Sequence, residues 1–237
     1  MINFIIKKIY KKILSYFLMI NADDNEIEII IIKNIDYYNL NTLKYLPKMK
    51  SNFDLVSNLN YDIKEVLYKG CFYLPNLLCD INDLKIFNKL NVELLSNNDK
   101  LTDWSKHYKI DNPTDSNTFN KIVDCLKNYF NINVLATRLN YYTQNDYKPF
   151  HHDSHAYTNG QKEDITIGLS LGGTRSLAFK HVESNQNFYF PQNNGDVFCF
   201  DHLTNKKFQH SISKLKNTND ENIRLSIILW GKKIEKN

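Results

Sequence analysis

The spacing of hydrophobic residues along the chain changes at about residue 130. Before this point, residues 81–95 and 118–130 carry apolar side chains three and four positions apart, the spacing of one face of a helix. We therefore expect two helices here, and Asp80 or Asn82 can cap the first. The predicted apolar face of the second helix contains Ile122, Cys125, Leu126 and Phe130.

After residue 130 the pattern becomes one of short β-rich runs. Gly, Asn, Asp and Ser separate these runs, and no helical segment of similar strength lies between them. Evenly spaced strands of this kind predict a sandwich or barrel rather than a parallel α/β sheet. We expect an α+β fold in which early helices support a jelly-roll core. The runs are VLATRLNYY, DITIGLSLG, SLAFKHV, NFYFP, DVFCFD, FQHSIS and IRLSIILWG.

Segments with weaker patterns lie ahead of and between the helices. Residues 26–32 (EIEIIII) predict a strand, and residues 67–78 (LYKGCFYLPNLL) predict a strand that runs into a turn. Residues 35–60 and 96–117 are polar with weak periodicity, so we expect irregular structure there.

The first twenty residues, MINFIIKKIYKKILSYFLMI, predict an amphipathic helix with a basic face. Four lysines interrupt the apolar run, so it makes a poor transmembrane helix. It can pack on the domain, lie on a membrane surface or act as a signal sequence. The signal sequence is the weakest of these, because the lysines sit late and the following NADD is an atypical cleavage region. With no convincing signal peptide or transmembrane span, we expect a cytoplasmic or nuclear protein.

Composition narrows the class of protein only a little. The 237 residues are 42% hydrophobic and 24% charged, which is ordinary for a globular domain and excludes collagen-like and wholly disordered chains. A net charge of +4 permits nucleic-acid binding without indicating it. None of the four cysteines sits in a CxxC pair, so neither a zinc ribbon nor a redox motif is present, and we expect reduced thiols.

The clearest chemical signal is a cluster of histidines in PFHHDSHAY. Residues two apart in a strand share a face, so His151 and Asp153 can bind one metal ion together while His152 points away. A third ligand has to come from another strand, and His202 or His210 can supply it. Two imidazoles and one carboxylate on a triangular face form the iron site of non-haem Fe(II) oxygenases.

An arginine in an apolar strand is the second signal. The chain has three arginines, and Arg224 lies within IRLSIILW, fourteen residues after His210. A buried guanidinium suits the distal carboxylate of 2-oxoglutarate, because its planar fork makes two parallel hydrogen bonds. Ser226 shares the same strand face and can add a hydroxyl group. An alternative is an edge-strand arginine that points to water.

From about residue 62 onward the sequence resembles the AlkB-like Fe(II)/2-oxoglutarate-dependent dioxygenases. Five motifs occur in the family's order: an Asn-x-Tyr pair, an HxD pair, an SLG strand, a Gly-Asp turn with a distal His, and a later Arg. In this chain they are Asn140 and Tyr142; His151 and Asp153; Ser170, Leu171, Gly172 and Phe179; Gly195, Asp196 and His210; and Arg224. The resemblance favours His210 over His202.

The resemblance implies a double-stranded β-helix (jelly-roll) core and an iron- and 2-oxoglutarate-dependent oxygenase that consumes O2. His151, Asp153 and His210 would bind Fe(II), and Asn140, Tyr142, Arg224 and Ser226 would contact 2-oxoglutarate. It divides the chain into an N-terminal extension, residues 1–61, and a dioxygenase domain, residues 62–237.

Two departures from the family's pattern affect the choice of substrate. Where the family has a second arginine, this chain has Trp230, and where repair enzymes place an acid after the HxD pair it has Ser154 and His155. Three functions therefore stay open. They are oxidative demethylation or hydroxylation of single-stranded or damaged nucleic acid; hydroxylation of a protein side chain, lipid or small metabolite; and an inactive jelly-roll binding module. Residues 1–20 add a membrane surface as a further partner.

Overall fold

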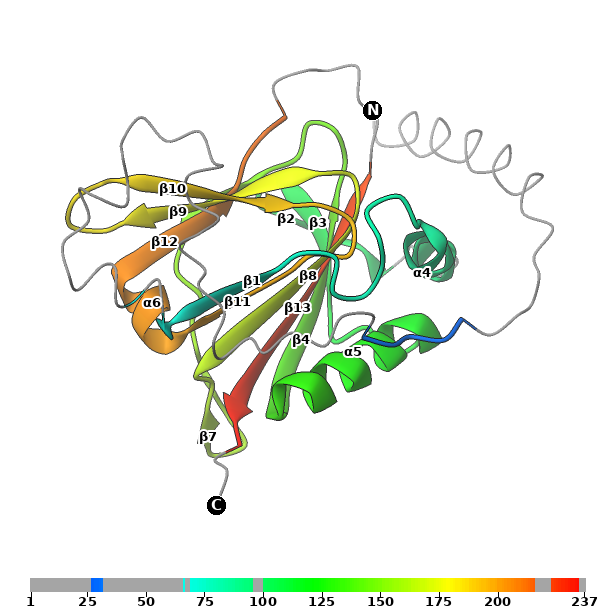
Figure 1. The fold of residues 1–237 in the computed structure, drawn as a ribbon, viewed down its shortest axis with the longest axis horizontal. Helices are drawn as coiled ribbons and strands as arrows, with labels where there is room; N and C mark the ends of the chain where they lie inside the picture. Colours follow the sequence, from blue (N-terminus) through cyan, green and yellow to red (C-terminus); the bar gives the residue numbers. More distant parts are fainter. Residues whose placement is uncertain (1–26, 32–65, 67–68, 96–99, 216–222, 235–237) are drawn as a thin grey trace.

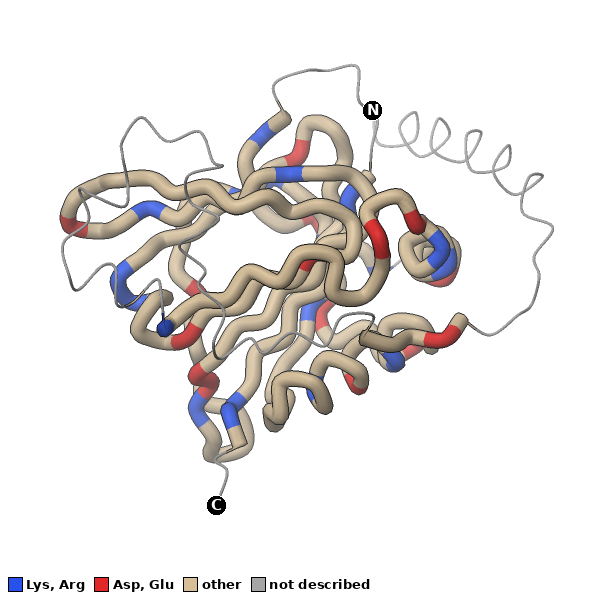
Figure 2. The backbone as a smooth tube through the Cα atoms, in the orientation of Figure 1, with Lys and Arg blue, Asp and Glu red and all other residues tan. Residues whose placement is uncertain are grey.

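Two antiparallel sheets lie face to face, and two helices cover the outer side of the larger sheet (Figure 1). This arrangement comes from a computed structural model, which describes residues 27–31, 66, 69–95, 100–215 and 223–234. Charged residues are few along the central strands and more frequent on the helices and at strand ends (Figure 2). The strands thus form the interior of the molecule.

The larger sheet has seven strands in the order β1-β11-β8-β13-β4-β3-β2. The long strand β13 lies between β8 and β4 and pairs with both along most of its length. The bounds are β1 (Cys71–Leu74), β2 (Thr102–Trp104), β3 (His107–Asp111), β4 (Ile132–Tyr142), β8 (Ile165–Gly172), β11 (Val197–Asp201) and β13 (Arg224–Lys233).

The smaller sheet has four strands in the order β10-β9-β12-β5. Its bounds are β5 (Lys148–His151), β9 (Arg175–His181), β10 (Asn187–Gln192) and β12 (Phe208–Ile212). A short helix, α6 (His202–Lys207), connects the two sheets between β11 and β12, with Asp201 as its N-cap. A separate hairpin of β6 (Tyr157–Thr158) and β7 (Gln161–Lys162) follows β5.

Two longer helices pack against the larger sheet, α4 (Lys85–Leu95) and α5 (Asn117–Phe130). The hydroxyl of Ser116 caps α5 by accepting the backbone N–H of Phe119, and Asn131 ends the helix in a left-handed conformation. Glu93 of α4 accepts hydrogen bonds from the hydroxyls of Ser116 and Thr118, so it joins the two helices. The pair therefore acts as one support for the sheet.

Strand alternation divides the interior into two layers. In β8, Ile165, Ile167, Leu169 and Leu171 face the helices and join the first hydrophobic core. The intervening Thr166, Gly168 and Ser170 face the smaller sheet instead. A second, aromatic core fills the space between the sheets and includes Phe179, Phe188, Phe190, Phe198, Phe200 and Phe208. Both faces of the central strands are thus buried, but only one of them is purely hydrocarbon.

The predicted α+β jelly roll with supporting helices is confirmed, and all seven predicted strand runs are strands. The irregular structure predicted for residues 96–117 is wrong, because β2 and β3 form a hairpin there. Its polar residues suit a strand after all, since His107 and Lys109 are buried toward the space between the sheets. Helix α4 begins at Lys85 rather than residue 81, and the side chain of Asp83 accepts the N–H of Lys85.

The strand predicted for residues 26–32 is also wrong over its described part, residues 27–31. Ile27, Ile29 and Ile31 pack on the first hydrophobic core, but no described strand pairs with them. The predicted basic helix of residues 1–20 and the domain boundary at residue 61 lie outside the described residues. Among the described helices, none combines the length and hydropathy that a membrane span requires.

Candidate active site

The pocket between the sheets is built by the polar faces of the central strands. Alternate residues line it, namely Asn140 and Tyr142 at the end of β4 and Arg224, Ser226, Ile228 and Trp230 from β13. The smaller sheet closes the other side with His151, His210, Leu177 and Ile212. The alternation that fills the helix-facing core with Leu and Ile therefore also delivers the polar groups of the site.

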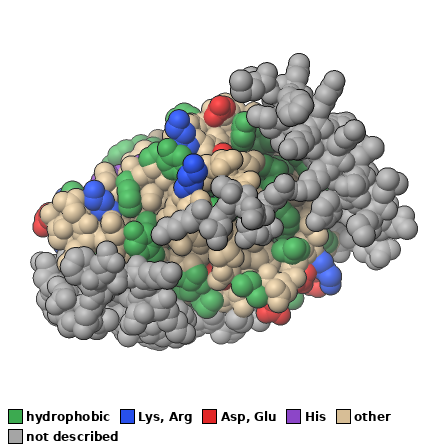
Figure 3. Space-filling view, turned by 90° about the horizontal axis from the view of Figure 1, so that it is seen from above, with side chains coloured by type: hydrophobic (Ala, Val, Ile, Leu, Met, Phe, Trp, Pro, Cys, Tyr) green, Lys and Arg blue, Asp and Glu red, His purple; other side chains and the backbone are tan. Residues whose placement is uncertain are grey.

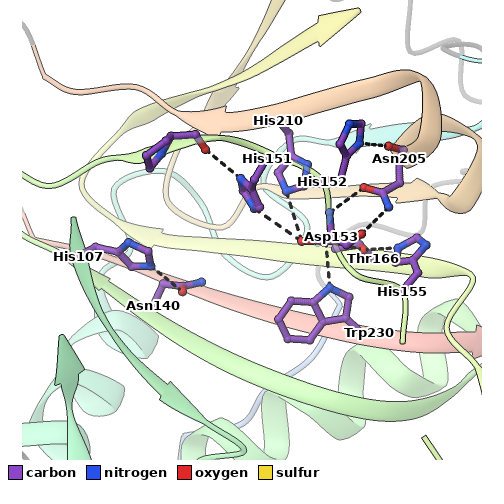
Figure 4. A network of polar contacts seen from close by, with 11 residues as sticks. His107, Asn140, His151, His152, Asp153, His155, Thr166, Asn205, His210 and Trp230 are labelled. Atoms are coloured by element: carbon purple, nitrogen blue, oxygen red, sulfur yellow. Dashed lines mark hydrogen bonds and ion pairs between the residues drawn. The ribbon is translucent and has the colours of Figure 1, made fainter. Parts of the chain in front are cut away.

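His151, Asp153 and His210 converge at one end of this pocket. The Oδ1 atom of Asp153 lies 3.7 Å from Nε2 of His151 and 3.5 Å from Nε2 of His210. β5 and β12 pair His151 directly with His210, and this pairing brings the two rings to a centroid distance of 4.1 Å. Figure 4 shows both imidazoles approaching the carboxylate from the same side. Among the described residues, these three form the one group of His, Cys, Asp or Glu side chains with metal-binding spacing.

The ring orientation of His151 leaves its inner nitrogen free to coordinate. Nδ1 donates to the carbonyl of Pro149 at 2.9 Å, so in the neutral ring Nε2 carries a lone pair. Nε2 is buried and has no hydrogen-bond partner among the described residues. Burial, reinforced by the charges of His210 and Lys148, lowers the pKa of His151 to about 3, which keeps the ring neutral. An orphaned acceptor aimed at a carboxylate fits a bound cation.

The second oxygen of Asp153 is held by the larger sheet. Oδ2 accepts hydrogen bonds from the hydroxyl of Thr166 and from Nε1–H of Trp230, both at 2.9 Å (Figure 4). Because the Thr166 hydroxyl gives its single proton to Asp153, Nε2–H of His155 donates to Thr166. Burial alone would raise the pKa of Asp153, but the charge and hydrogen bond of His210 outweigh it and lower the pKa. The carboxylate is thus fixed in its ionised form with Oδ1 facing the histidines.

Arg224 marks the opposite end of the pocket. Its side chain is 1% exposed, and Nε–H donates to the hydroxyl of Ser170 at 2.8 Å. The guanidinium lies 5.2 Å from the ring of Tyr142, yet no residue that the structure describes forms a hydrogen bond with the buried Nη1. Burial lowers the pKa of Arg224 to about 10, so the group remains charged at neutral pH. A buried cation with an unused donor fits a carboxylate ligand.

Asn140 and Tyr142 lie between these two ends, and His107 supports both. Nε2–H of His107 donates to Oδ1 of Asn140 at 3.1 Å, and its ring stacks on Tyr142 with centroids 4.7 Å apart. Burial raises the pKa of Tyr142 to about 12, which keeps its hydroxyl protonated. Burial also lowers the pKa of His107 to about 4, so this ring is neutral at pH 7.

Beyond the edge of the smaller sheet, the same face of the larger sheet continues as a rim of aromatic and charged residues. Asp111 pairs with both Lys109 and Arg138. Lys109 lies over the ring of Trp104 at 4.1 Å, and Arg138 lies over Trp230 at 5.1 Å. Trp104 is 46% exposed although it neighbours these charges. A planar, anionic molecule would find stacking and ionic partners here.

The sequence-predicted site residues all line the one pocket: His151, Asp153, His210, Asn140, Tyr142, Arg224 and Ser226. His202 is exposed on α6 and is not a member of that group, while His152 bonds to the backbone of Asn205. His155 is buried against Thr166 rather than directed at the pocket. Sequence reasoning missed His107, Lys148 and Thr166 as parts of the site. In the sequence, only their positions within strands could have indicated this role, because a strand residue reaches the site only if it occupies the face of the sheet that borders the pocket.

Comparison with solved structures identifies the fold. The chain superposes on a prolyl-4-hydroxylase from Pseudomonas putida with a TM-score of 0.50 and 10% sequence identity, over 70% of this chain and 93% of that one. The two proteins share a fold. Two further likenesses are a 2OG-Fe(II) oxygenase family oxidoreductase from Burkholderia pseudomallei and OsALKBH1. The first has a TM-score of 0.49 and 13% identity, over 69% of this chain and 85% of that one. OsALKBH1 has a TM-score of 0.47 and 15% identity, over 68% of this chain and 97% of that one. Neither protein-family profiles nor curated protein sequences give a match.

Proposed function

We propose that this protein is an Fe(II)- and 2-oxoglutarate-dependent oxygenase. The observation that carries the proposal is that one pocket contains two polar atoms without hydrogen-bond partners among the described residues, one at each end. At one end, Nε2 of His151 faces an ionised Asp153 without a hydrogen-bond partner. At the other end, the buried Arg224 keeps Nη1 unused. A metal ion at the first end and a dicarboxylate reaching to the second would satisfy both.

In this proposal each residue has one task. His151, Asp153 and His210 hold Fe(II) on one face, and Arg224 forms an ion pair with the distal carboxylate of 2-oxoglutarate, next to Asn140, Tyr142 and Ser226. When bound, the metal and 2-oxoglutarate supply dioxygen activation, which yields succinate and carbon dioxide and inserts one oxygen atom into a substrate C–H bond. The aromatic core around Phe198 and Phe200 excludes water from the metal end.

We propose further that the substrate is an N-alkylated base in single-stranded or damaged nucleic acid. Hydroxylation of an N-methyl group gives a product that collapses to formaldehyde and the free base. The rim supports this choice, because Trp104 offers a stacking surface, and Lys109 and Arg138 share one acid, Asp111, so a net positive charge remains beside it. On the face drawn in Figure 3, the visible Lys and Arg side chains are few and lie among hydrophobic and uncharged groups.

The proposed chemistry is tested by succinate release from 2-oxoglutarate with Fe(II) and ascorbate, without added substrate. We expect turnover in the natural protein and loss of it in Asp153→Ala, because one ligand of three is gone. His152→Ala is the matched control, since this ring makes its bond to the backbone of Asn205. Turnover that survives in Asp153→Ala would refute the metal site.

The proposed substrate needs a separate measurement. N-methylated single-stranded DNA and RNA oligonucleotides are assayed for formaldehyde and succinate together. We expect at least one of them to raise succinate release above the substrate-free level with an equal yield of formaldehyde. If none does while substrate-free turnover persists, the chemistry stands and the nucleic-acid substrate is excluded.

A further inference from the structure

Lys148 enters the pocket because of an irregularity in β5. His151 pairs with His210, and Lys148 pairs with Ile212. Three steps along β5 therefore match two steps along β12, so β5 contains one extra residue. In a regular strand, residues three apart point to opposite faces. The extra residue reverses this, and Lys148 lines the same pocket as His151. The intervening Phe150 is 39% exposed on the outside.

The ammonium group of Lys148 has no partner of its own. No hydrogen bond or ion pair joins it to any residue that the structure describes, although the side chain is partly buried. The charges that act on it most strongly are those of Asp153, Arg138, Lys109 and Asp111. Asp153 faces the two histidines, and Asp111 is engaged by Lys109 and Arg138. Both nearby carboxylates thus already interact with other side chains.

An unpartnered cation in a pocket is costly unless a bound anion compensates it. Moving an ammonium group out of water carries a large desolvation penalty, and burial lowers the pKa of Lys148 to about 8. Nη1 of Arg224 is likewise buried without a hydrogen-bond partner among the described residues. Lys148 is paired across from Ile212, on the opposite sheet from Arg224. The pocket therefore offers two separate places for negative charge.

We propose that Lys148 is a second anion-binding residue of the pocket and binds a carboxylate or phosphate group of a molecule held beside the metal triad. This inference rests on the proposed oxygenase function. The shared chemistry is an oxyanion, and it has two sources: the carboxylate of 2-oxoglutarate that lies nearest the metal, or an acidic group of the substrate. Lys148 distinguishes an anionic from a neutral ligand at the metal end, as Arg224 does at the other end.

The test measures binding rather than turnover. The natural protein, Lys148→Met and Lys148→Arg are loaded with Mn(II) without oxygen, and calorimetry gives dissociation constants for 2-oxoglutarate and for a single-stranded DNA trinucleotide with a central N-methyladenine. Methionine keeps the apolar stem and removes the charge. Lys180→Met is the matched control, because Lys180 lies on the outer face of the same sheet, beside Phe150. Thermal unfolding shows that each variant folds.

We expect Lys148→Met to weaken one of the two ligands by about 10- to 100-fold, as for a lost hydrogen bond to a charged group. Lys148→Arg should recover part of this loss, and Lys180→Met should change neither constant. A weaker 2-oxoglutarate complex identifies the cosubstrate as the source. A weaker trinucleotide complex with unchanged 2-oxoglutarate identifies the substrate. If the natural protein binds Mn(II) and 2-oxoglutarate and Lys148→Met changes neither ligand, the inference is overturned while the oxygenase function stands.

Discussion

At the scale of single residues, the site is defined by which hydrogen-bonding atoms already have a partner in the protein and which do not. Ser170 engages one nitrogen of Arg224 and leaves another unused, while Trp230 and Thr166 engage one oxygen of Asp153 and leave the other facing the histidines. In both side chains, one polar atom is therefore hydrogen-bonded to the larger sheet and another is available to a ligand. Anchoring fixes direction before a ligand arrives, which lowers the entropy lost on binding.

Arg224→Ala should sharply raise the concentration of 2-oxoglutarate needed for half-maximal succinate release. Truncating one partner of a buried charge pair costs about 2–5 kcal/mol, so the KM should increase by well over tenfold. Arg224→Lys should restore only part of the affinity, because an ammonium group lacks the planar fork. An unchanged 2-oxoglutarate requirement in Arg224→Ala would remove this residue from the cosubstrate site.

Trp230→Phe should weaken metal binding while the protein stays folded. The ring is kept, but Nε1–H no longer donates to Asp153, and loss of a hydrogen bond to a metal ligand typically costs about 10- to 100-fold in affinity. Mn(II) binding measured by calorimetry gives the effect. Thr166→Val removes the other donor to the same oxygen and should act in the same direction. Trp104→Phe is the control, since that tryptophan lies on the exposed rim, and equal affinities in all variants would contradict the anchoring role.

At the scale of elements, the turn before β11 depends on a glycine. Gly195 has a φ of +82°, and a Cβ placed on it would lie 2.2 Å from the carbonyl oxygen of Cys79. The next residue, Asp196, is fully buried and accepts hydrogen bonds from the hydroxyl of Tyr73 and the backbone N–H of Asn76. The Gly-Asp pair thus joins β1 to β11 and sets where β11 begins.

Gly195→Ala should destabilise the fold more than Gly160→Ala does. Both glycines have positive φ, and the left-handed conformation costs an alanine about 1–2 kcal/mol. Nothing lies within 4 Å of a Cβ on Gly160, whereas the collision at Gly195 should add about 1–3 kcal/mol. Urea unfolding of the two variants measures the difference. Equal losses would mean that the backbone around Cys79 yields freely.

The sequence predicted strands well where one face of the strand is apolar, and poorly where the buried face carries polar residues. Runs such as ITIGLSLG and RLSIILWG alternate strongly, and they are strands as expected. The hairpin of β2 and β3 was missed because its inward residues, His107 and Lys109, are polar. The facing of His151 and Asp153 could be predicted from period two, but that of Lys148 could not. It depends on an extra residue that becomes visible only when β5 is paired with β12.

At the scale of the whole molecule, buried neutral histidines make stability depend on pH. The pKa of His107 is lowered from an ordinary 6.5 to about 4, because burial disfavours the charged ring. The unfolded chain therefore binds more protons than the folded one between these values. The stabilisation is fully present above about pH 6.5 and is lost as the pH falls toward 4.

His107→Gln should flatten this pH dependence. Glutamine can still donate to Asn140 but does not titrate, so the variant should lose less stability than the natural protein between pH 7 and pH 4.5. The difference should reach about 2 kcal/mol at the lower pH for a shift of this size. Urea unfolding at both pH values measures it. His152→Gln is the control, since that ring is exposed, and identical slopes for His107→Gln and the natural protein would rule out His107 as a source.

The two-layer use of the central strands limits how the length of this chain can vary. In β8 and β13 the odd positions serve one layer and the even positions the other, so inserting or deleting one residue would exchange them. Thr166, Ser170 or Arg224 would then point into hydrocarbon, and leucines would enter the pocket. Such a shift of register would reduce both the stability of the fold and the affinity for ligands. Length variation among descendants of this chain is therefore confined to the connections between strands, and the spacing from Ile165 to Gly172 and from Arg224 to Trp230 stays fixed.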